Sequence, residues 1–188
     1  MLTTLPVQPT LWRTCRAIAN RTRLQIFGLL VRQPGQTVSA VAARLRQPLS
    51  VASAYLRTLE ARGLLTARRV GRRVEYRPSP VTGGGPAQGL VVALRLAFQH
   101  ESQPVQTIFR LATAFTHPRR VEIFRGLLAA PQTLEQMHIA SGISGRALRR
   151  HLRKLEARGL VTCRQGMYAV ADCPGAFGRE LARLAAGG

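Results

Sequence analysis

The sequence predicts a mainly α-helical fold of the α+β class, arranged as two similar domains that each end in a two-stranded β-hairpin. The hexapeptide L-E-A-R-G-L occurs at Leu59–Leu64 and again at Leu155–Leu160, 96 residues further along the chain. A helical segment of the pattern I-F-x-x-L precedes each copy, and a short β-like stretch interrupted by Gly follows each. A repeat that recurs in the same setting indicates two copies of one module.

In the first domain, residues 10–78, apolar residues at helical spacing predict helices over 11–20, 23–31, 38–45 and 49–62. Residues 32–36 are expected to form a turn that contains Pro and Gly, and Gln47-Pro48 separates the last two helices. Gly63 is expected to cap the last helix. Strands over 64–70 and 73–77 then form a hairpin around Gly71-Arg72.

A linker and a packing helix are expected between the domains, in residues 79–103. Residues 78–86 (P-S-P-V-T-G-G-G-P) have the composition of a linker. Helix 87–100 is apolar on nearly all sides, with Arg95 as its one charge, so it must be buried on several sides. It forms either an intramolecular pseudo-dimer contact between the modules or the interface of a homodimer, and its apolar extent favours the homodimer.

The second domain, residues 104–186, repeats the order of the first. Helices are predicted over 105–116, 118–130, 133–140, 144–158 and 174–185, with strands over 160–164 and 167–171. Pro118 suits a first helical turn. Ser144 is expected to cap helix 144–158 at its start, and Gly159 at its end.

This order of elements is that of a winged helix-turn-helix domain. The segments A-N-R-T-R-L-Q-I-F-G-L-L (19–30), L-E-A-R-G-L-L (59–65) and R-R-V-G-R-R-V-E-Y-R (68–77) look like those of ArsR-type repressors. The second copy is similar through residues 117–128 and 144–161. The resemblance implies a dimeric DNA-binding repressor whose recognition helix enters the major groove of DNA while its wing contacts the backbone or the minor groove. The chain departs from that family in carrying two modules, and in having no cysteine in residues 38–45, where metal-sensing members carry a C-x-C-type pair.

The charge of the chain also predicts a polyanionic partner. Its 28 basic and 8 acidic residues give a net charge of +20. Residues 1–94 hold 14 basic and 2 acidic residues, and residues 95–188 hold 14 and 6, so no single basic tail explains the excess. An arginine-rich genome would explain Arg in place of Lys, but not the shortage of Asp and Glu. We therefore expect double-stranded DNA as the partner.

Helical periodicity places Leu148, Leu152 and Leu155 in the core and a group of arginines on the opposite face of recognition helix 144–158. Guanidinium groups suit phosphates and guanine edges, and a merely solvated basic face would repel itself. The DNA-binding residues expected in the second module are Ser144, Arg146, Arg149, Arg150 and Arg153 on this helix, and Arg164 on wing 160–171.

Recognition helix 49–62 has the matching core stripe of Ala52, Leu56 and Leu59, but its outer face is small and weakly polar. It either approaches thymine methyl groups closely or does not read bases. The DNA-binding residues expected in the first module are Ser50, Ser53, Ala54 and Arg57 on this helix, and Arg68, Arg69, Arg72, Arg73 and Arg77 on wing 64–77. Because base contacts specify sequence and phosphate contacts supply affinity, the second module is expected to read more of the sequence.

We expect no enzymatic activity, no cofactor and no metal site. His100, His117, His138 and His151 are isolated in the sequence, Asp172 is the only Asp, and no phosphate-loop or nucleophile-elbow motif occurs. Cys15 and Cys163 are expected in the core and Cys173 at the surface. With neither an apolar run of 18 residues nor a signal peptide, we expect a cytoplasmic protein with no membrane partner. The rival functions are a non-specific architectural DNA-binding or RNA-binding protein and, third, a protein-interaction scaffold.

Overall fold

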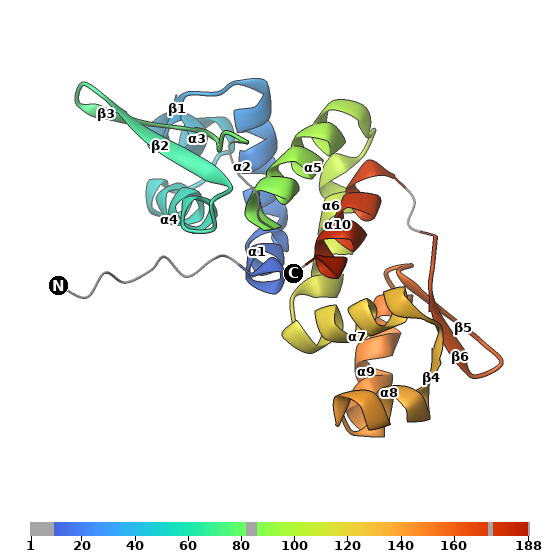
Figure 1. The fold of residues 1–188 in the computed structure, drawn as a ribbon. Coiled ribbons are helices and arrows are strands. Elements are labelled where there is room, and N and C mark those ends of the chain that lie inside the picture. Colours follow the sequence, from blue (N-terminus) through green and yellow to red (C-terminus); the bar gives the residue numbers. More distant parts are fainter. Residues whose placement is uncertain (1–9, 82–85, 173–174, 188) are drawn as a thin grey trace.

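The computed structural model describes residues 10–81, 86–172 and 175–187, and its elements fall into two halves with the same order (Figure 1). The first half consists of α1 (Leu11–Ile18), α2 (Arg21–Arg32), β1 (Gln36–Thr37), α3 (Val38–Arg44), α4 (Leu49–Glu60), β2 (Leu65–Val70), β3 (Arg73–Pro78) and α5 (Pro86–His100). The second half consists of α6 (Pro104–Ala112), the 3-10 turn η1 (Thr113–Phe115), α7 (Pro118–Ala129), β4 (Gln132–Thr133), α8 (Leu134–Ser141), α9 (Gly145–Glu156), β5 (Val161–Arg164), β6 (Met167–Val170) and α10 (Ala176–Ala186).

Each half contains a three-stranded antiparallel sheet, ordered β1-β3-β2 in the first half and β4-β6-β5 in the second. Strands β1 and β4 differ from the prediction, which places Gln36 in a turn and Thr133 in a helix and assigns no strand there. Both strands read Gln-Thr, and they recur at the 96-residue spacing of the hexapeptide repeat. In each, the threonine hydroxyl also caps the next helix, since Thr37 accepts from the amide of Ala40 and Thr133 from that of Gln136.

The repeated hexapeptide is the C-terminal cap of the two longer helices. The amide of Leu64 donates to the carbonyl of Leu59 at 3.0 Å, and the amide of Leu160 donates to that of Leu155 at 3.1 Å. Gly63 and Gly159 have φ values of +69° and +72°, which glycine adopts without strain. The predicted glycine caps are confirmed, although α4 and α9 end at Glu60 and Glu156, two residues before the predicted ends.

The first helix of each half ends earlier than predicted, because an arginine from the next helix takes its last carbonyl groups. Arg23 donates through Nε to the carbonyl of Ala17, and through Nη2 to that of Arg16 at 3.1 Å. In the second half, Arg120 donates to the carbonyl of Ala114 in the same way. These carbonyls would otherwise lack partners at a helix end. Helix α1 therefore stops at Ile18, and the predicted helix 105–116 ends in η1.

The helix starts agree with the predictions in part. Pro118 occupies the first turn of α7, as predicted. Ser144 stands at the N-cap position of α9, but its side chain makes no capping hydrogen bond, so the predicted capping role is wrong. Pro48 stands at the matching position before α4, where it has no hydroxyl to offer. The turn before the recognition helix is thus set by backbone conformation, which is nearly the same at both residues.

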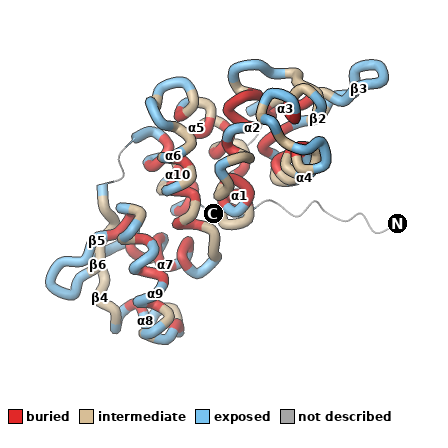
Figure 2. The backbone as a smooth tube through the Cα atoms, turned by 180° about the vertical axis from the view of Figure 1, so that it is seen from behind, coloured by how far each residue is buried: buried red, intermediate tan, exposed pale blue. Residues whose placement is uncertain are grey.

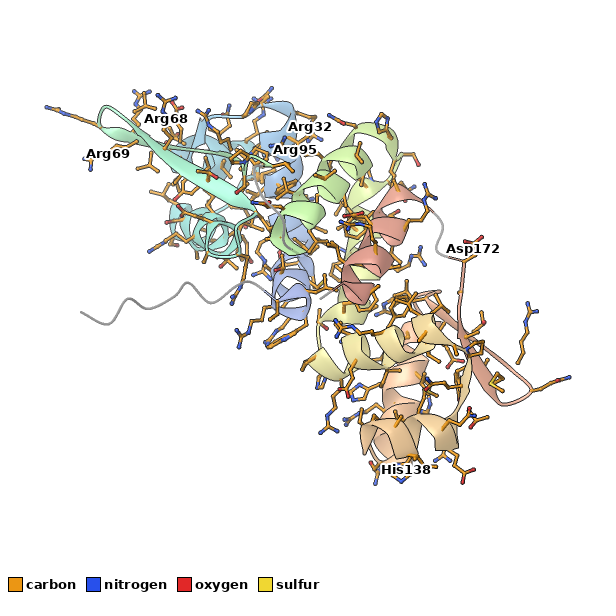
Figure 3. The ribbon with its side chains drawn as sticks, in the orientation of Figure 1. Arg32, Arg68, Arg69, Arg95, His138 and Asp172 are labelled. Carbon is orange, nitrogen blue, oxygen red and sulfur yellow. The ribbon has the colours of Figure 1, made fainter. Side chains whose placement is uncertain are left out.

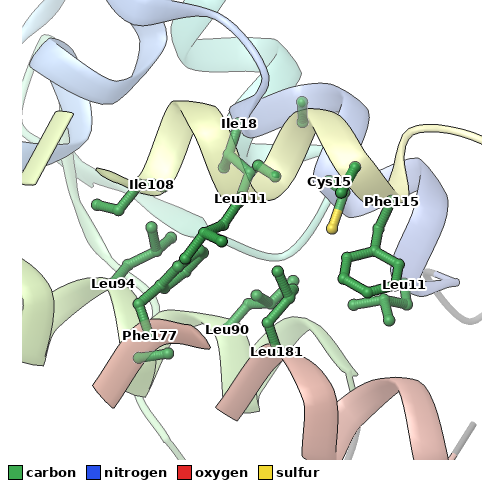
Figure 4. Close-up of a cluster of buried hydrophobic side chains, with 14 of the residues drawn as sticks. Leu11, Cys15, Ile18, Leu90, Leu94, Ile108, Leu111, Phe115, Phe177 and Leu181 are labelled. Atoms are coloured by element: carbon green, nitrogen blue, oxygen red, sulfur yellow. The ribbon is translucent and has the colours of Figure 1, made fainter. Parts of the chain in front are cut away.

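A single hydrophobic core runs through both halves, as the red segments of Figure 2 show. Helix α5 lies at its centre and packs against α1, α2, α6 and α10. Leu90, Val91 and Leu94 are fully buried, and Figure 4 shows Leu90 and Leu94 within the cluster. A Cβ atom built at Gly89 would lie 2.7 Å from Leu184 of α10, so this glycine permits the close approach of α5 and α10. Helix 87–100 is buried on several sides as predicted, and its cover comes from the same chain.

Of the cysteine predictions, the one for Cys15 is confirmed and the one for Cys163 is wrong. Cys15 is fully buried, and burial raises the pKa of its thiol above the ordinary value. Cys163 is exposed, so its predicted core position is wrong: β5 runs along an outlying hairpin in which Val161 alone is buried. Cys173 and the linker residues 82–85 lie outside the described residues. Among the described helices, none is long and apolar enough to cross a membrane.

Replacing Gly63 with Ala should lower the free energy of unfolding by about 1–2 kcal/mol, because the alanine must adopt a left-handed backbone conformation. Space is not the obstacle, since the nearest atom to a Cβ there is 3.5 Å away. The matched control is Gly126→Ala inside α7, where a Cβ would be 3.7 Å from its nearest neighbour. That change should stabilise the protein by about 0.5–1 kcal/mol. Urea unfolding measures both, and equal effects would contradict the capping role.

Candidate nucleic-acid interface

Helix α9 carries the most concentrated positive charge on a helix face. Its core stripe is as predicted, with Leu148, Leu152 and Leu155 fully buried. The predicted outward arginines are all exposed: Arg146, Arg149, Arg150 and Arg153. An open hollow along this face is lined by Ser144, Arg146, Ala147, Arg150 and Arg153, with no acidic residue among them. Such a surface matches the charge and the hydrogen-bonding geometry of phosphates and guanine edges.

Helix α4 presents a different outer face on the same scaffold. Ala52, Leu56 and Leu59 are fully buried, as predicted. Ser50, Ala54 and Arg57 are exposed and Ser53 is half-buried, so one arginine stands where α9 has several. The first exposed residue of the helix is Leu49, whose large apolar side chain is 59% exposed. This face can approach a groove closely but offers few hydrogen-bond donors.

The two hairpins also differ. Strands β2 and β3 have six residues each, whereas β5 and β6 have four, so the first hairpin is longer by two residue pairs, or about 7 Å. Its exposed cations are Arg68, Arg69, Arg72 and Arg73, of which Figure 3 labels the first two. On the second hairpin, Arg164 is the predicted cation and is also exposed. Arg77 is half-buried, and its Nη2 lies 4.0 Å from a carboxylate oxygen of Glu75, so it is less available to a partner than the other four.

Few of the cations are neutralised within the described part of the chain. Two ion pairs occur there, the weak contact of Arg77 with Glu75 and that of Arg183 with Glu180 at 2.6 Å. Neither involves the outer face of α4 or α9. The resulting repulsion between like charges would be relieved by a bound polyanion.

The fold brings together two histidines that are separate in the sequence. The rings of His117, at the start of α7, and His151, on α9, have centroids 4.8 Å apart. His151 is 3% exposed, and its Nδ1 atom has no hydrogen-bond partner. Burial, aided by the charges of His117 and Arg120, lowers the pKa of His151 to about 4. Groups of three or more potential metal ligands are absent from the described residues.

No signal in the linear sequence marks this histidine pair, although alignment of the two halves shows which positions the histidines occupy. His117 and His151 stand at the positions that Asn20 and Tyr55 occupy in the first half. Asn20 and His117 both cap the following helix through a side-chain acceptor, so the capping function survives the change of residue.

Comparison with known proteins supports a helix-turn-helix regulator. Residues 18–68, from the end of α1 into β2, match the family described as a helix-turn-helix domain. A stretch of 65 residues, 35% of the chain, is 45% identical to the HTH-type transcriptional regulator Rv0324 of Mycobacterium tuberculosis (strain ATCC 25618 / H37Rv). The chain spans 28% of that protein's length. No solved structure matches the chain.

The buried, neutral state of His151 predicts a loss of stability in mild acid. Its folded pKa of about 4 lies below the ordinary 6.5, so below pH 6.5 the unfolded chain takes up a proton that the native state refuses. The penalty should grow as the pH falls from 6.5 to about 4 and reach about 3 kcal/mol. Urea unfolding across this range should show a smaller loss for His151→Gln. Parallel curves for the two proteins would rule out the assignment.

Proposed function

We propose that this chain is a sequence-specific DNA-binding transcriptional regulator that acts as a repressor. One observation carries the proposal: the helix that follows the turn in the matched segment, α4, has a counterpart, α9, whose outward arginines have no acidic partner among the described residues. The recognition helices enter the major groove, and the hairpins act as wings on the DNA backbone. The repressor role rests on the resemblance to ArsR-type repressors.

Both halves are proposed to be winged helix-turn-helix domains, at residues 10–78 and 104–186, joined through 79–103. Support comes from the shared order of elements, the shared sheet order and the paired arginine contacts of Arg23 and Arg120. Helix α1 contacts α6, and α5 contacts α10, so each half supplies the same two helices to the contact between them. The chain would therefore act as an intramolecular pseudo-dimer on an asymmetric site, with half-sites about one DNA turn apart.

The two halves are proposed to contribute differently to DNA binding: the second half reads bases, and the first half mainly contacts phosphates. Base reading needs donors on a helix inside the major groove, and α9 has them. Phosphate contacts need only accessible positive charge, which the longer first wing supplies. The small face of α4 beside that wing would also suit non-specific binding to duplex DNA or RNA. That is the alternative against which the proposal is tested.

The decisive experiment is selection of bound sequences from random duplex DNA at physiological salt. The wild-type protein should yield a consensus, and Arg146→Ala with Arg150→Ala should flatten it, because each lost base contact removes about 1–3 kcal/mol of discrimination. The matched double change Arg72→Ala with Arg73→Ala removes the same charge from the wing. It should weaken binding to all sequences alike and leave the consensus intact.

Two results would refute this division. No consensus together with a steep salt dependence would favour the architectural or RNA-binding alternative. A consensus that survives loss of Arg146 and Arg150 but collapses without Arg72 and Arg73 would assign base reading to the first wing.

The pseudo-dimer predicts a monomer in solution. Light scattering should give the mass of one chain, 20.6 kDa, independent of protein concentration, because α10, α6 and α1 already cover α5. Twice that mass would instead indicate a homodimer, formed around surface such as Leu96, which is 39% exposed on α5.

A further inference from the structure

A second basic surface lies away from the outer face of α4, in an open hollow of about 380 Å³ between α1, α2 and the end of α4. The residues that line it are Trp12, Arg13, Arg16, Ala17, Arg23, Thr58 and Arg62. Four of these seven residues are arginines and none is acidic. A concave site collects positive potential more strongly than a convex one, so the hollow favours an anion.

Three of the four guanidinium groups make no hydrogen bond or ion pair within the described residues. Arg23 is occupied by the carbonyls at the end of α1. Arg13 and Arg16 lie over the ring of Trp12, at 5.1 and 5.8 Å from its centroid, which holds them beside the hollow. Neither they nor Arg62 donate a side-chain hydrogen bond or form an ion pair within the described residues.

At the matching place in the second half, the equivalent side chains are engaged in hydrogen bonds. Arg13, Arg16 and Arg62 correspond to Arg110, Thr113 and Arg158. Arg110 donates to the carbonyl of Arg158 at 2.9 Å, and Arg158 donates through Nε to the hydroxyl of Thr113, also at 2.9 Å. The difference at the centre of the cluster is therefore Arg16 in place of Thr113. A hydroxyl there accepts from its neighbour, whereas a third guanidinium can only repel it and adds donors.

We propose that the hollow of Trp12, Arg13, Arg16 and Arg62 binds a phosphate group. A guanidinium group can donate two parallel hydrogen bonds to two phosphate oxygens. The three guanidinium groups of Arg13, Arg16 and Arg62 together carry enough positive charge to neutralise a phosphate dianion. The phosphate belongs either to a free small molecule or to the DNA backbone, and only the second source rests on the proposed function. In either case the matching residues of the second half, Arg110, Thr113 and Arg158, are already joined by hydrogen bonds.

The chain supplies its own probe, because Trp12 is its only tryptophan. Titration with inorganic phosphate, at ionic strength held constant with chloride, should change the tryptophan fluorescence saturably. Arg16→Thr installs the residue of the second half and should raise the dissociation constant for phosphate about tenfold or more. The matched control Arg32→Thr removes an equal charge from the exposed end of α2, away from the hollow, and should leave the constant within about twofold.

The same titration with duplex DNA separates the two sources. A fluorescence response to duplex but not to inorganic phosphate, with duplex affinity reduced by Arg16→Thr more than by Arg32→Thr, assigns the site to the DNA backbone. A response to phosphate that Arg16→Thr removes assigns it to a free anion, whether or not the protein selects a DNA sequence.

The proposal is overturned if Trp12 responds to neither probe, or if Arg16→Thr and Arg32→Thr weaken binding equally. Either result can accompany a clear DNA consensus, so it would leave the proposed function standing. Circular dichroism verifies that Arg16→Thr is folded, as expected for a side chain that is exposed and makes no hydrogen bond in the described residues. The reverse change, Thr113→Arg, removes the acceptor of Arg158 and should raise the number of phosphate sites measured by calorimetry from one to two.

Discussion

The packing of α5 against α10 is the constraint on which the rest of the architecture depends. It joins the two halves into one core, and Gly89 leaves room at this contact for the side chains of Leu184 and Glu180. With the halves fixed to each other, the positions of α4 and α9 follow, since each is held by the capped turn after it and by the helices beneath it. A side chain at residue 89 would have to displace the ends of the Leu184 and Glu180 side chains at this contact.

The sequence was sufficient to predict the features that depend on local pattern. The repeated hexapeptide led to two similar halves, and the helical period placed Leu56 and Leu152 in the core, where the structure has them. Prediction failed where side-chain contacts or the packing of a whole element decide the outcome. The side chain of Arg120 ends the preceding helix, and the isolation of the β5–β6 hairpin exposes Cys163. Strand β4 was missed although its Gln-Thr pair repeats that of β1, because two residues show no periodicity.

Within the candidate site, sequence could place residues on a face but not say what they contact. The arginines of α9 are exposed as the period requires, whereas Arg77, on a strand, is half-buried beside Glu75. The contact of His117 with His151 joins two helices and has no linear signature. Comparison of the halves recovers some of this information, because equivalent positions share a backbone and differ only in chemistry. Asn20 and His117 both cap the helix that follows them. Thr113 accepts a hydrogen bond from Arg158, whereas Arg16 at the matching position is a further hydrogen-bond donor.

If the chain acts as the pseudo-dimer proposed above, the cover of α5 by its own chain also affects how a regulated gene would respond to the protein level. A regulator assembled from two subunits dissociates on dilution and loses its second DNA-binding domain. The occupancy of its DNA site then falls steeply as the protein concentration falls. Here, once one half is on DNA, the other would stay near it at an effective concentration on the order of millimolar. Occupancy would then follow protein level in a gradual, hyperbolic manner, and small amounts of the chain would retain the full avidity of both halves.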